Sequence, residues 1–117
     1  MKNHIKIKNI IKPFNKKIEV SGDKSISIRC VLLASQAIGK SKIYNLLESE
    51  DVMNALRSIK KFFIKYKKYK NYYEISGYGI GGFNDTRKLT INAGNSGTLA
   101  RLILGLLVNF KNKVIIK

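Results

Sequence analysis

Two stretches of the sequence combine glycine, hydroxyl-bearing and cationic side chains where a helix is expected to begin. They read Gly22-Asp23-Lys24-Ser25-Ile26-Ser27-Ile28-Arg29 and Asn92-Ala93-Gly94-Asn95-Ser96-Gly97-Thr98, the second continuing to Arg101. The first turn of a helix carries unpaired backbone N–H groups and the positive end of the helix dipole. Both stretches are therefore suited to binding an anion such as phosphate or carboxylate.

The side chains of the first stretch favour the same chemistry. Ser25 and Ser27 offer hydroxyl donors, and Lys24 and Arg29 offer charge-assisted ones. If Ser25 opens the helix, Arg29 follows it by four residues and lies on the same helix face. Two such sites in one small chain predict a ligand that has more than one anionic group.

Composition limits the class of protein. The 117 residues are enough for one domain with a core, and a hydrophobic content of 44% is ordinary for a soluble globular protein. No apolar run approaches bilayer length and no signal-peptide core follows residues 1–8, so we expect a cytoplasmic protein without membrane contact. The single Cys30 excludes an internal disulfide, and with the single His4 it cannot form a zinc site, so no metal is expected.

The formal net charge of +16 calls for an anionic partner such as nucleic acid, an acidic membrane surface or a phosphorylated metabolite. However, lysine, isoleucine, asparagine, tyrosine and phenylalanine dominate the chain, and lysine far outnumbers arginine. This skew resembles A/T-rich codon usage, which raises lysine without regard to function. The charge alone is therefore a weak indication of nucleic-acid binding.

The first half of the chain alternates strand and helix patterns. Segments 5–11 and 17–20 alternate polar and apolar residues, which is typical of strands. Residues 26–38 have apolar positions at helical spacing, and Gly39 is expected to end this helix. Segment 42–47 is a further strand candidate. Ser49 can cap a second helix that carries Glu50 and Asp51 in its first turn and an apolar face from Val52 to Phe63.

The second half begins with interleaved lysines and tyrosines at 60–73. This composition allows base stacking and phosphate contacts, as in an RNA-binding module, but a hairpin of 64–69 and 72–76 with exposed lysines and half-buried tyrosines is favoured. The glycine-rich 77–82 predicts a flexible loop, and 89–92 a short strand. Asn95 or Ser96 then caps a helix, and a strand at 114–116 reaches the end of the sequence, as expected for a truncated domain.

Three motifs together resemble the amino-terminal part of the EPSP synthase (3-phosphoshikimate 1-carboxyvinyltransferase) family. The resemblance covers about residues 11–116. It rests on Gly22-Asp23-Lys24-Ser25-Ile26-Ser27 with Arg29, on Asn45-Leu46-Leu47-Glu48-Ser49-Glu50-Asp51-Val52, and on Ala93-Gly94-Asn95-Ser96-Gly97-Thr98 with Arg101. Ile28 departs from the pattern, since many relatives carry histidine there. The sister family that acts on a UDP-sugar is less similar, because its first motif lacks the Asp-Lys-Ser-Ile-Ser core.

The resemblance implies an α/β fold, namely the β-α-β-α-β-β unit of the family's inside-out α/β barrel. Residues 1–117 would form a partial domain of about one unit and the start of the next, with the second domain absent. The family moves the enolpyruvyl group of phosphoenolpyruvate to the 5-hydroxyl of shikimate 3-phosphate and releases phosphate, without a cofactor. This reaction belongs to the shikimate pathway of aromatic amino acid biosynthesis.

The resemblance also implies roles for four substrate-binding residues. Lys24 would contact phosphoenolpyruvate close to the shikimate ligand. Ser25 and Arg29 would hold shikimate 3-phosphate, and Gly97 would line the phosphoenolpyruvate pocket at close range.

Supporting residues are implied as well. Asp51 would orient Lys24, Asn95 and Thr98 would shape the loop around the pocket, and Arg101 completes the third motif. The carboxylates near the motifs are expected to pair with Lys24 or to cap a helix; they are Asp23, Glu48, Glu50 and Asp51. No residue of the segment is assigned a catalytic role.

The isolated segment is therefore expected to be inactive. The rest of the enzyme would lie beyond Lys117 in the same polypeptide or in a partner chain. Two alternatives are a small basic RNA-binding module and a non-catalytic half that completes a partner chain.

Overall fold

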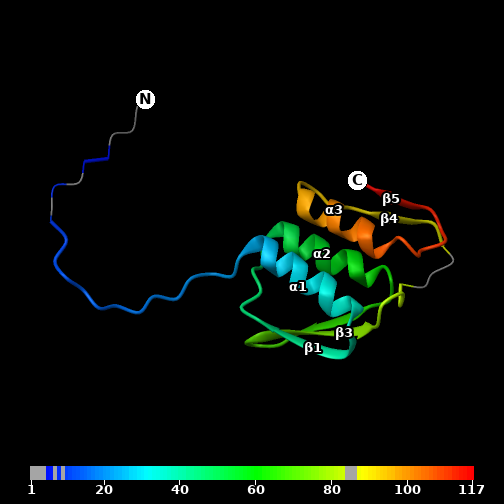
Figure 1. Cartoon of the computed structure of the whole chain (residues 1–117), viewed down its shortest axis with the longest axis horizontal. Helices are drawn as coiled ribbons and strands as arrows, with labels where there is room; N and C mark the ends of the chain where they lie inside the picture. Colours follow the sequence, from blue (N-terminus) through cyan, green and yellow to red (C-terminus); the bar gives the residue numbers. More distant parts are fainter. Residues whose placement is uncertain (1–4, 7, 9, 84–86) are drawn as a thin grey trace.

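The computed structural model describes residues 5, 6, 8, 10–83 and 87–117. Its elements follow the order α1 (Lys24–Gln36), β1 (Ile38–Tyr44), α2 (Glu50–Lys60), β2 (Lys65–Lys68), β3 (Tyr72–Tyr78), β4 (Leu89–Ile91), α3 (Gly97–Leu106) and β5 (Val114–Ile116). Figure 1 shows α1 and α2 between a sheet that contains β1 and β3 and a second layer formed by α3, β4 and β5. The expected α/β class is confirmed.

The first sheet is antiparallel with the strand order β1-β3-β2. Along β3, Tyr73 and Ile75 are buried, whereas Tyr72 and Glu74 are only half-buried, so one face of the sheet packs on the helices. This pattern confirms the hairpin prediction. The glycine-rich segment, however, is not all loop, because Gly77 and Tyr78 complete β3.

The predicted helices form, with shifted ends. α1 begins at Lys24 and ends at Gln36, where Ala37 turns to an extended conformation. Residues from Ile38 onward enter β1 because they pair with β3, so Gly39 lies within a strand and the expected stop at Gly39 was wrong. α2 begins at Glu50 as predicted, but Phe63 lies beyond its end and is 55% exposed.

Apolar side chains from both layers meet in one core. Phe62, two residues beyond the end of α2, stacks on Phe83 with ring centroids 4.3 Å apart and meets Phe110 edge-on at 5.5 Å. The fully buried Leu99 and Ile103 of α3 belong to the same cluster. β4 pairs in parallel with β5, with Ile91 opposite Ile116, so α3 is the crossover helix of a β-α-β unit.

The segment before α1 differs from the sequence prediction. Its described residues form no strand, and Ile10 and Phe14 remain 95% and 71% exposed. Alternating apolar residues form a strand only where a neighbouring strand supplies hydrogen bonds, and none of the described strands pairs with residues 10–20. Ile7 and Asn9, within the predicted first strand, and His4 lie outside the described residues.

None of the helices in the described part of the chain is both long enough and apolar enough to span a bilayer.

Candidate functional site

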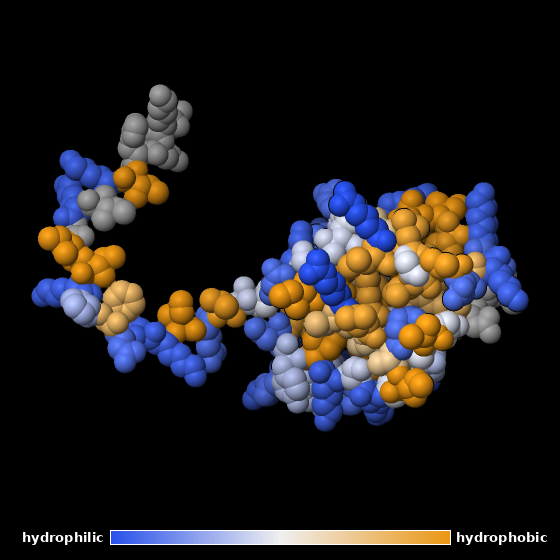
Figure 2. All heavy atoms as spheres, in the orientation of Figure 1, coloured by the Kyte–Doolittle hydropathy of each residue, from blue (hydrophilic) through white to orange (hydrophobic). Residues whose placement is uncertain are grey.

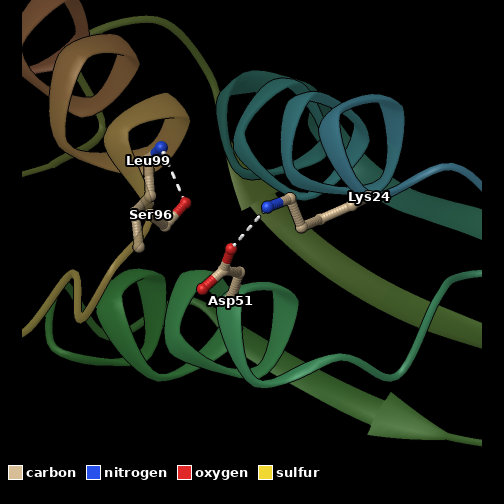
Figure 3. A network of polar contacts seen from close by, with 4 residues as sticks. All are labelled: Lys24, Asp51, Ser96 and Leu99. Carbon is tan, nitrogen blue, oxygen red and sulfur yellow. Dashed lines mark hydrogen bonds and ion pairs between the residues drawn. The ribbon is translucent and has the colours of Figure 1, made fainter. Parts of the chain in front are cut away.

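The three helices begin at the same end of the molecule, and their starts carry the sequence motifs (Figures 1 and 3). Lys24, the first residue of α1, reaches across to the first turn of α2, where its Nζ lies 2.9 Å from Asp51 Oδ2. Ser96, at the start of α3, lies beside this ion pair in Figure 3. Two segments separated by about seventy residues of sequence are thus brought to one surface.

The start of α1 is capped by Asp23. Its Oδ1 accepts a hydrogen bond of 2.7 Å from the backbone N–H of Ile26, which makes Asp23 the N-cap rather than Ser25. Ser25 lies inside the first turn and is half-buried, while the Lys24 side chain is 51% exposed. The hydroxyl of Ser25, the ammonium of Lys24 and the remaining first-turn N–H groups are therefore available to an anion.

Gly22 and Ser27 of the same motif have packing roles. A Cβ on Gly22 would lie 2.1 Å from the carbonyl oxygen of Asn45, so only glycine fits there. The backbone N–H of Leu47 donates a hydrogen bond of 3.1 Å to Ser27 Oγ. The expectation that Ser27 would present its hydroxyl to a ligand was wrong, because the side chain is buried against the loop that leads to α2.

The start of α3 is capped by Ser96, whose Oγ accepts from the Leu99 N–H at 3.1 Å. Asn95, the other predicted cap, is exposed. A Cβ on Gly94 would lie 2.8 Å from Asn54 Nδ2, which places this turn directly against α2. By contrast, a Cβ on Gly97 would meet no protein atom within 4 Å.

Two cations complete this end of the molecule. Arg29 lies one turn after Ser25 on α1, and Arg101 lies one turn after Gly97 on α3; both side chains are exposed. Within the described ranges neither forms an ion pair. Thr98, in the first turn of α3, is half-buried. The helix starts therefore carry Lys24, Arg29 and Arg101 together with the acidic side chains of Asp23, Glu50 and Asp51, of which Asp51 pairs with Lys24.

Glu48, expected to pair with Lys24 or to cap a helix, does neither. It lies 2.5 Å from Lys68 Nζ and accepts a hydrogen bond of 2.9 Å from the Tyr73 hydroxyl. These hydrogen bonds, chiefly that from Lys68, lower the pKa of Glu48, while the hydrogen bond to Glu48 raises the pKa of Lys68. Burial, more than the hydrogen bond, raises the pKa of Tyr73. The cluster anchors the loop before α2 to the hairpin.

Sequence reasoning missed this cluster. The hairpin register places Lys68 opposite Tyr73, which the predicted strand pairing could have indicated. Nothing in the sequence joins that pair to Glu48, which follows β1. Ser49, next to it, occupies the predicted N-cap position of α2, but its hydroxyl makes no capping hydrogen bond.

Two tyrosines of the hairpin, Tyr69 and Tyr72, are engaged with each other. Tyr69 stacks on Tyr72 with ring centroids 4.7 Å apart, and Lys67 lies 5.0 Å from the Tyr69 centroid. Ring faces covered in this way are less accessible to a nucleic-acid base, which requires an open face for stacking. Among the described residues no cluster of three or more His, Cys, Asp or Glu side chains could hold a metal ion.

Comparison with known proteins gives one consistent result. The profile of the EPSP synthase (3-phosphoshikimate 1-carboxyvinyltransferase) family matches residues 8–117. The 3-phosphoshikimate 1-carboxyvinyltransferase of Bradyrhizobium diazoefficiens is 37% identical over 94 residues, which are 80% of this chain and 20% of that protein. The enzyme of the same name from Streptococcus pyogenes is 37% identical over 103 residues, which are 88% of this chain and 24% of that protein.

Solved structures agree with the sequence relatives. One structure of EPSP synthase from Acinetobacter baumannii superposes with a TM-score of 0.70 at 31% identity, covering 79% of this chain and 21% of that chain. A second structure of EPSP synthase from the same organism gives a TM-score of 0.74 at 28% identity, covering 87% and 23%. The chain thus spans between a fifth and a quarter of the length of these relatives, and it belongs to the EPSP synthase family.

Proposed function

We propose that this chain forms one wall of the site in which the enolpyruvyl group of phosphoenolpyruvate is transferred to the 5-hydroxyl of shikimate 3-phosphate, with release of phosphate. The observation that carries the proposal is the meeting of three helix starts around the Lys24–Asp51 ion pair. Both substrates are phosphorylated acids, and exposed cations beside first-turn N–H groups suit two such anions.

Shikimate 3-phosphate is assigned to the start of α1. The hydroxyl and backbone N–H of Ser25 can donate to phosphate oxygens. Arg29, one turn further along, can add a planar pair of N–H donors, which a lysine could not reproduce.

Phosphoenolpyruvate is assigned to the space between α1 and α3. The Lys24 ammonium has three donors, of which Asp51 takes one and fixes the direction of the side chain. The open space at Gly97 lets a small anion approach the first turn of α3, with Asn95 and Thr98 beside it. Arg101 adds positive charge on the same helix.

Turnover requires more than this wall. Enolpyruvyl transfer needs a proton delivered to carbon, a proton removed from the attacking hydroxyl, and stabilisation of charge between closed surfaces. Asp23 caps α1, Glu48 is bound by Lys68 and Tyr73, and Asp51 holds Lys24, so these three carboxylates already have structural partners. The fourth, Glu50, is exposed in the first turn of α2. The remaining groups would come from the rest of the enzyme, either in the same polypeptide or in a partner.

The proposal is tested by titrating purified 1–117 with each substrate while recording NMR chemical shifts. Shifts should concentrate at the starts of α1 and α3. Lys24→Ala should weaken the binding of both ligands. Lys65→Ala, which removes the same charge from the outer face of the sheet, should not. Equal losses from the two variants would indicate diffuse charge attraction and contradict the assigned site.

Activity separates binding from catalysis. Phosphate release from both substrates should be undetectable with 1–117 alone and should appear when a polypeptide carrying the remaining part of a family enzyme is added. Steady turnover by 1–117 alone would contradict the division into two walls.

A further inference from the structure

An open groove lies beside the end of α2 and the start of β2. It has a volume of about 570 Å³ and is lined by Lys60, Phe63, Ile64, Lys65, Tyr66 and Tyr78. The rings of Phe63 and Tyr78 are both more than half exposed, and the Tyr78 hydroxyl donates a hydrogen bond of 3.3 Å to the backbone carbonyl of Phe63. A groove of this size can accommodate a small molecule. We refer to it as the Phe63 groove.

The Phe63 groove is separate from the candidate site at the helix starts. Lys60, which lines the groove, is the last residue of α2, whereas Asp51 lies in the first turn of the same helix. At the usual rise per residue, these two positions are roughly 14 Å apart along the helix axis. None of the residues assigned to shikimate 3-phosphate or phosphoenolpyruvate lines the groove. A ligand bound there would therefore occupy a second site.

The backbone of Phe63 has a conformation that favours glycine. Its φ is +65°, in the left-handed region that bulky residues rarely adopt. The N–H of Ile64 donates to the carbonyl of Ile59 at 3.3 Å, which forms the helix-ending turn that usually places glycine at the left-handed position. Phe62 and Ile64, on either side, are buried in the core, but the Phe63 ring is outside it. A strained, bulky and exposed residue of this kind indicates a role in function rather than in folding.

Positive charge surrounds the exposed ring. Lys60 and Lys65 line the groove, and Arg87 Cζ lies 4.9 Å from the Phe63 ring centroid. Neither lysine forms an ion pair with another residue in the described part of the chain, and the lining includes no carboxylate. Figure 2 shows mainly hydrophilic side chains over the neighbouring sheet of β1 and β3, so the exposed aromatic rings of the groove are an exception there. Aromatic rings beside unpaired ammonium groups suit a ligand that has both a flat ring and a negative charge.

We propose that the Phe63 groove binds a small aromatic carboxylate, with its ring against Phe63 and Tyr78 and its carboxylate at Lys60 and Lys65. The ring would gain aromatic contacts, and the ammonium groups would donate charge-assisted hydrogen bonds. A nucleic-acid strand is a poorer occupant, because it requires a series of open rings, and Tyr69 and Tyr72 of the same hairpin cover each other. The inference goes beyond the proposed function, since neither proposed substrate contains an aromatic ring.

The test titrates 2-naphthoate into purified 1–117 while NMR chemical shifts are recorded. Shifts should concentrate at residues 60–66 and at Tyr78, and an excess of phosphoenolpyruvate and shikimate 3-phosphate should not reverse them. Two matched probes separate the ring from the charge. Cyclohexanecarboxylate has the charge without an aromatic ring, and 2-naphthamide has the ring without the charge. Each should bind about tenfold more weakly than 2-naphthoate or worse.

Variants of the groove separate binding from folding. Phe63→Gly should weaken 2-naphthoate binding by about tenfold. Its midpoint of urea unfolding should stay unchanged or rise, because glycine adopts the left-handed conformation without strain. Phe63→Tyr keeps the ring and should bind like the wild type. Lys65→Ala should weaken binding by about fivefold. Lys67→Ala is its matched control and should not, because Lys67 is exposed on the same strand but does not line the groove.

Four results would overturn the inference. The first is undiminished binding of 2-naphthoate to Phe63→Gly. The second is an equal loss from Lys65→Ala and Lys67→Ala, which would indicate diffuse charge attraction. The third is a set of shifts at the starts of α1 and α3 in place of the groove. The fourth is tighter binding of adenosine monophosphate than of 2-naphthoate at the same residues, which would make the groove a nucleotide site. If Phe63→Gly lowered the unfolding midpoint, the comparison of the two lysine variants would decide alone. None of these readouts depends on turnover or on substrate binding.

Discussion

The two glycine-containing motifs look alike in sequence but differ in structure. Gly22 lies in the first motif against the backbone of Asn45, with no room for a Cβ. Gly97 lies in the other motif at the first position of α3, and a Cβ there would enter open space. The comparison shows that a glycine at a helix start can serve close packing in one place and face open space in another.

The largest effect that tests this comparison is on stability. Gly22→Ala should lower the free energy of unfolding of 1–117 by roughly 2 kcal/mol, because the added methyl group must displace the Asn45 carbonyl or the chain before α1. Gly97→Ala should change it by less than about 0.5 kcal/mol. Urea unfolding followed by circular dichroism measures both values. Similar losses of stability in Gly22→Ala and Gly97→Ala would show that the two glycines do not differ in packing.

The next effect is on ligand affinity. Lys24→Ala should weaken binding of both phosphorylated substrates by roughly tenfold, because a charge-assisted hydrogen bond is lost. Asp51→Asn should weaken it less, since the lysine remains and only its orientation is released. Calorimetric titration of 1–117 gives both constants. If Asp51→Asn proved as harmful as Lys24→Ala, orientation rather than charge would dominate the site.

A smaller and more selective effect is expected from Gly97→Ala. The added methyl group should weaken the binding of phosphoenolpyruvate several-fold, which corresponds to about 1 kcal/mol, because it would occupy space assigned to this ligand. Shikimate 3-phosphate should be affected less, because it is assigned to the start of α1. Titration of each ligand separately decides this. Equal losses of affinity for the two ligands would mean that Gly97→Ala acts through the backbone of the loop before α3.

The smallest effect concerns the pH dependence of the Glu48 cluster. The folded-state pKa of Glu48 is lowered, so its contribution to stability is present above the unfolded pKa and is lost as pH falls through the folded pKa. The pKa values of Lys68 and Tyr73 are raised, so their contributions are lost only in alkali, as pH rises through the folded values. The stability difference between wild type and Glu48→Gln should thus be constant near neutral pH and shrink below pH of about 4.

Glu19→Gln is the matched control for this measurement, since Glu19 is exposed, lies outside the helices and strands, and forms no ion pair with another described residue. Urea unfolding between pH 3 and pH 8 compares the two variants. A stability difference for Glu48→Gln that persisted unchanged in acid would show that packing, rather than charge, holds the loop before α2.

Local patterns predicted the helices well, because apolar spacing and capping residues are properties of short segments. They predicted strands less well. The alternation at 5–11 satisfies the strand pattern, yet a strand depends on a partner that local sequence does not specify. For the same reason β1 begins at Ile38, where pairing with Tyr78 of β3 takes over from the helix pattern.

The candidate site shows the same limit. The pairing of Lys24 with Asp51 followed from the resemblance, and the structure contains that contact. The packing roles of Gly22 and Ser27 were not predicted, because they depend on residues about twenty positions away in the loop before α2. Sequence identified the motif correctly, but only the fold distinguishes its packing residues from those free to meet a ligand.

The common end of the three helices also affects how fast an anion arrives. Each helix start contributes roughly half a positive charge. The carboxylates of Asp23, Glu50 and Asp51 offset this charge at the starts of α1 and α2, whereas the first turn of α3 carries no acidic residue. At physiological ionic strength, salt screens charges beyond about 8 Å. Lysines on the outer face of the sheet, such as Lys65 and Lys67, therefore attract an approaching anion only weakly from across the core. The association rate of a phosphorylated metabolite should therefore depend on distant lysines only in dilute salt, whereas the helix ends should continue to accelerate capture in the cell.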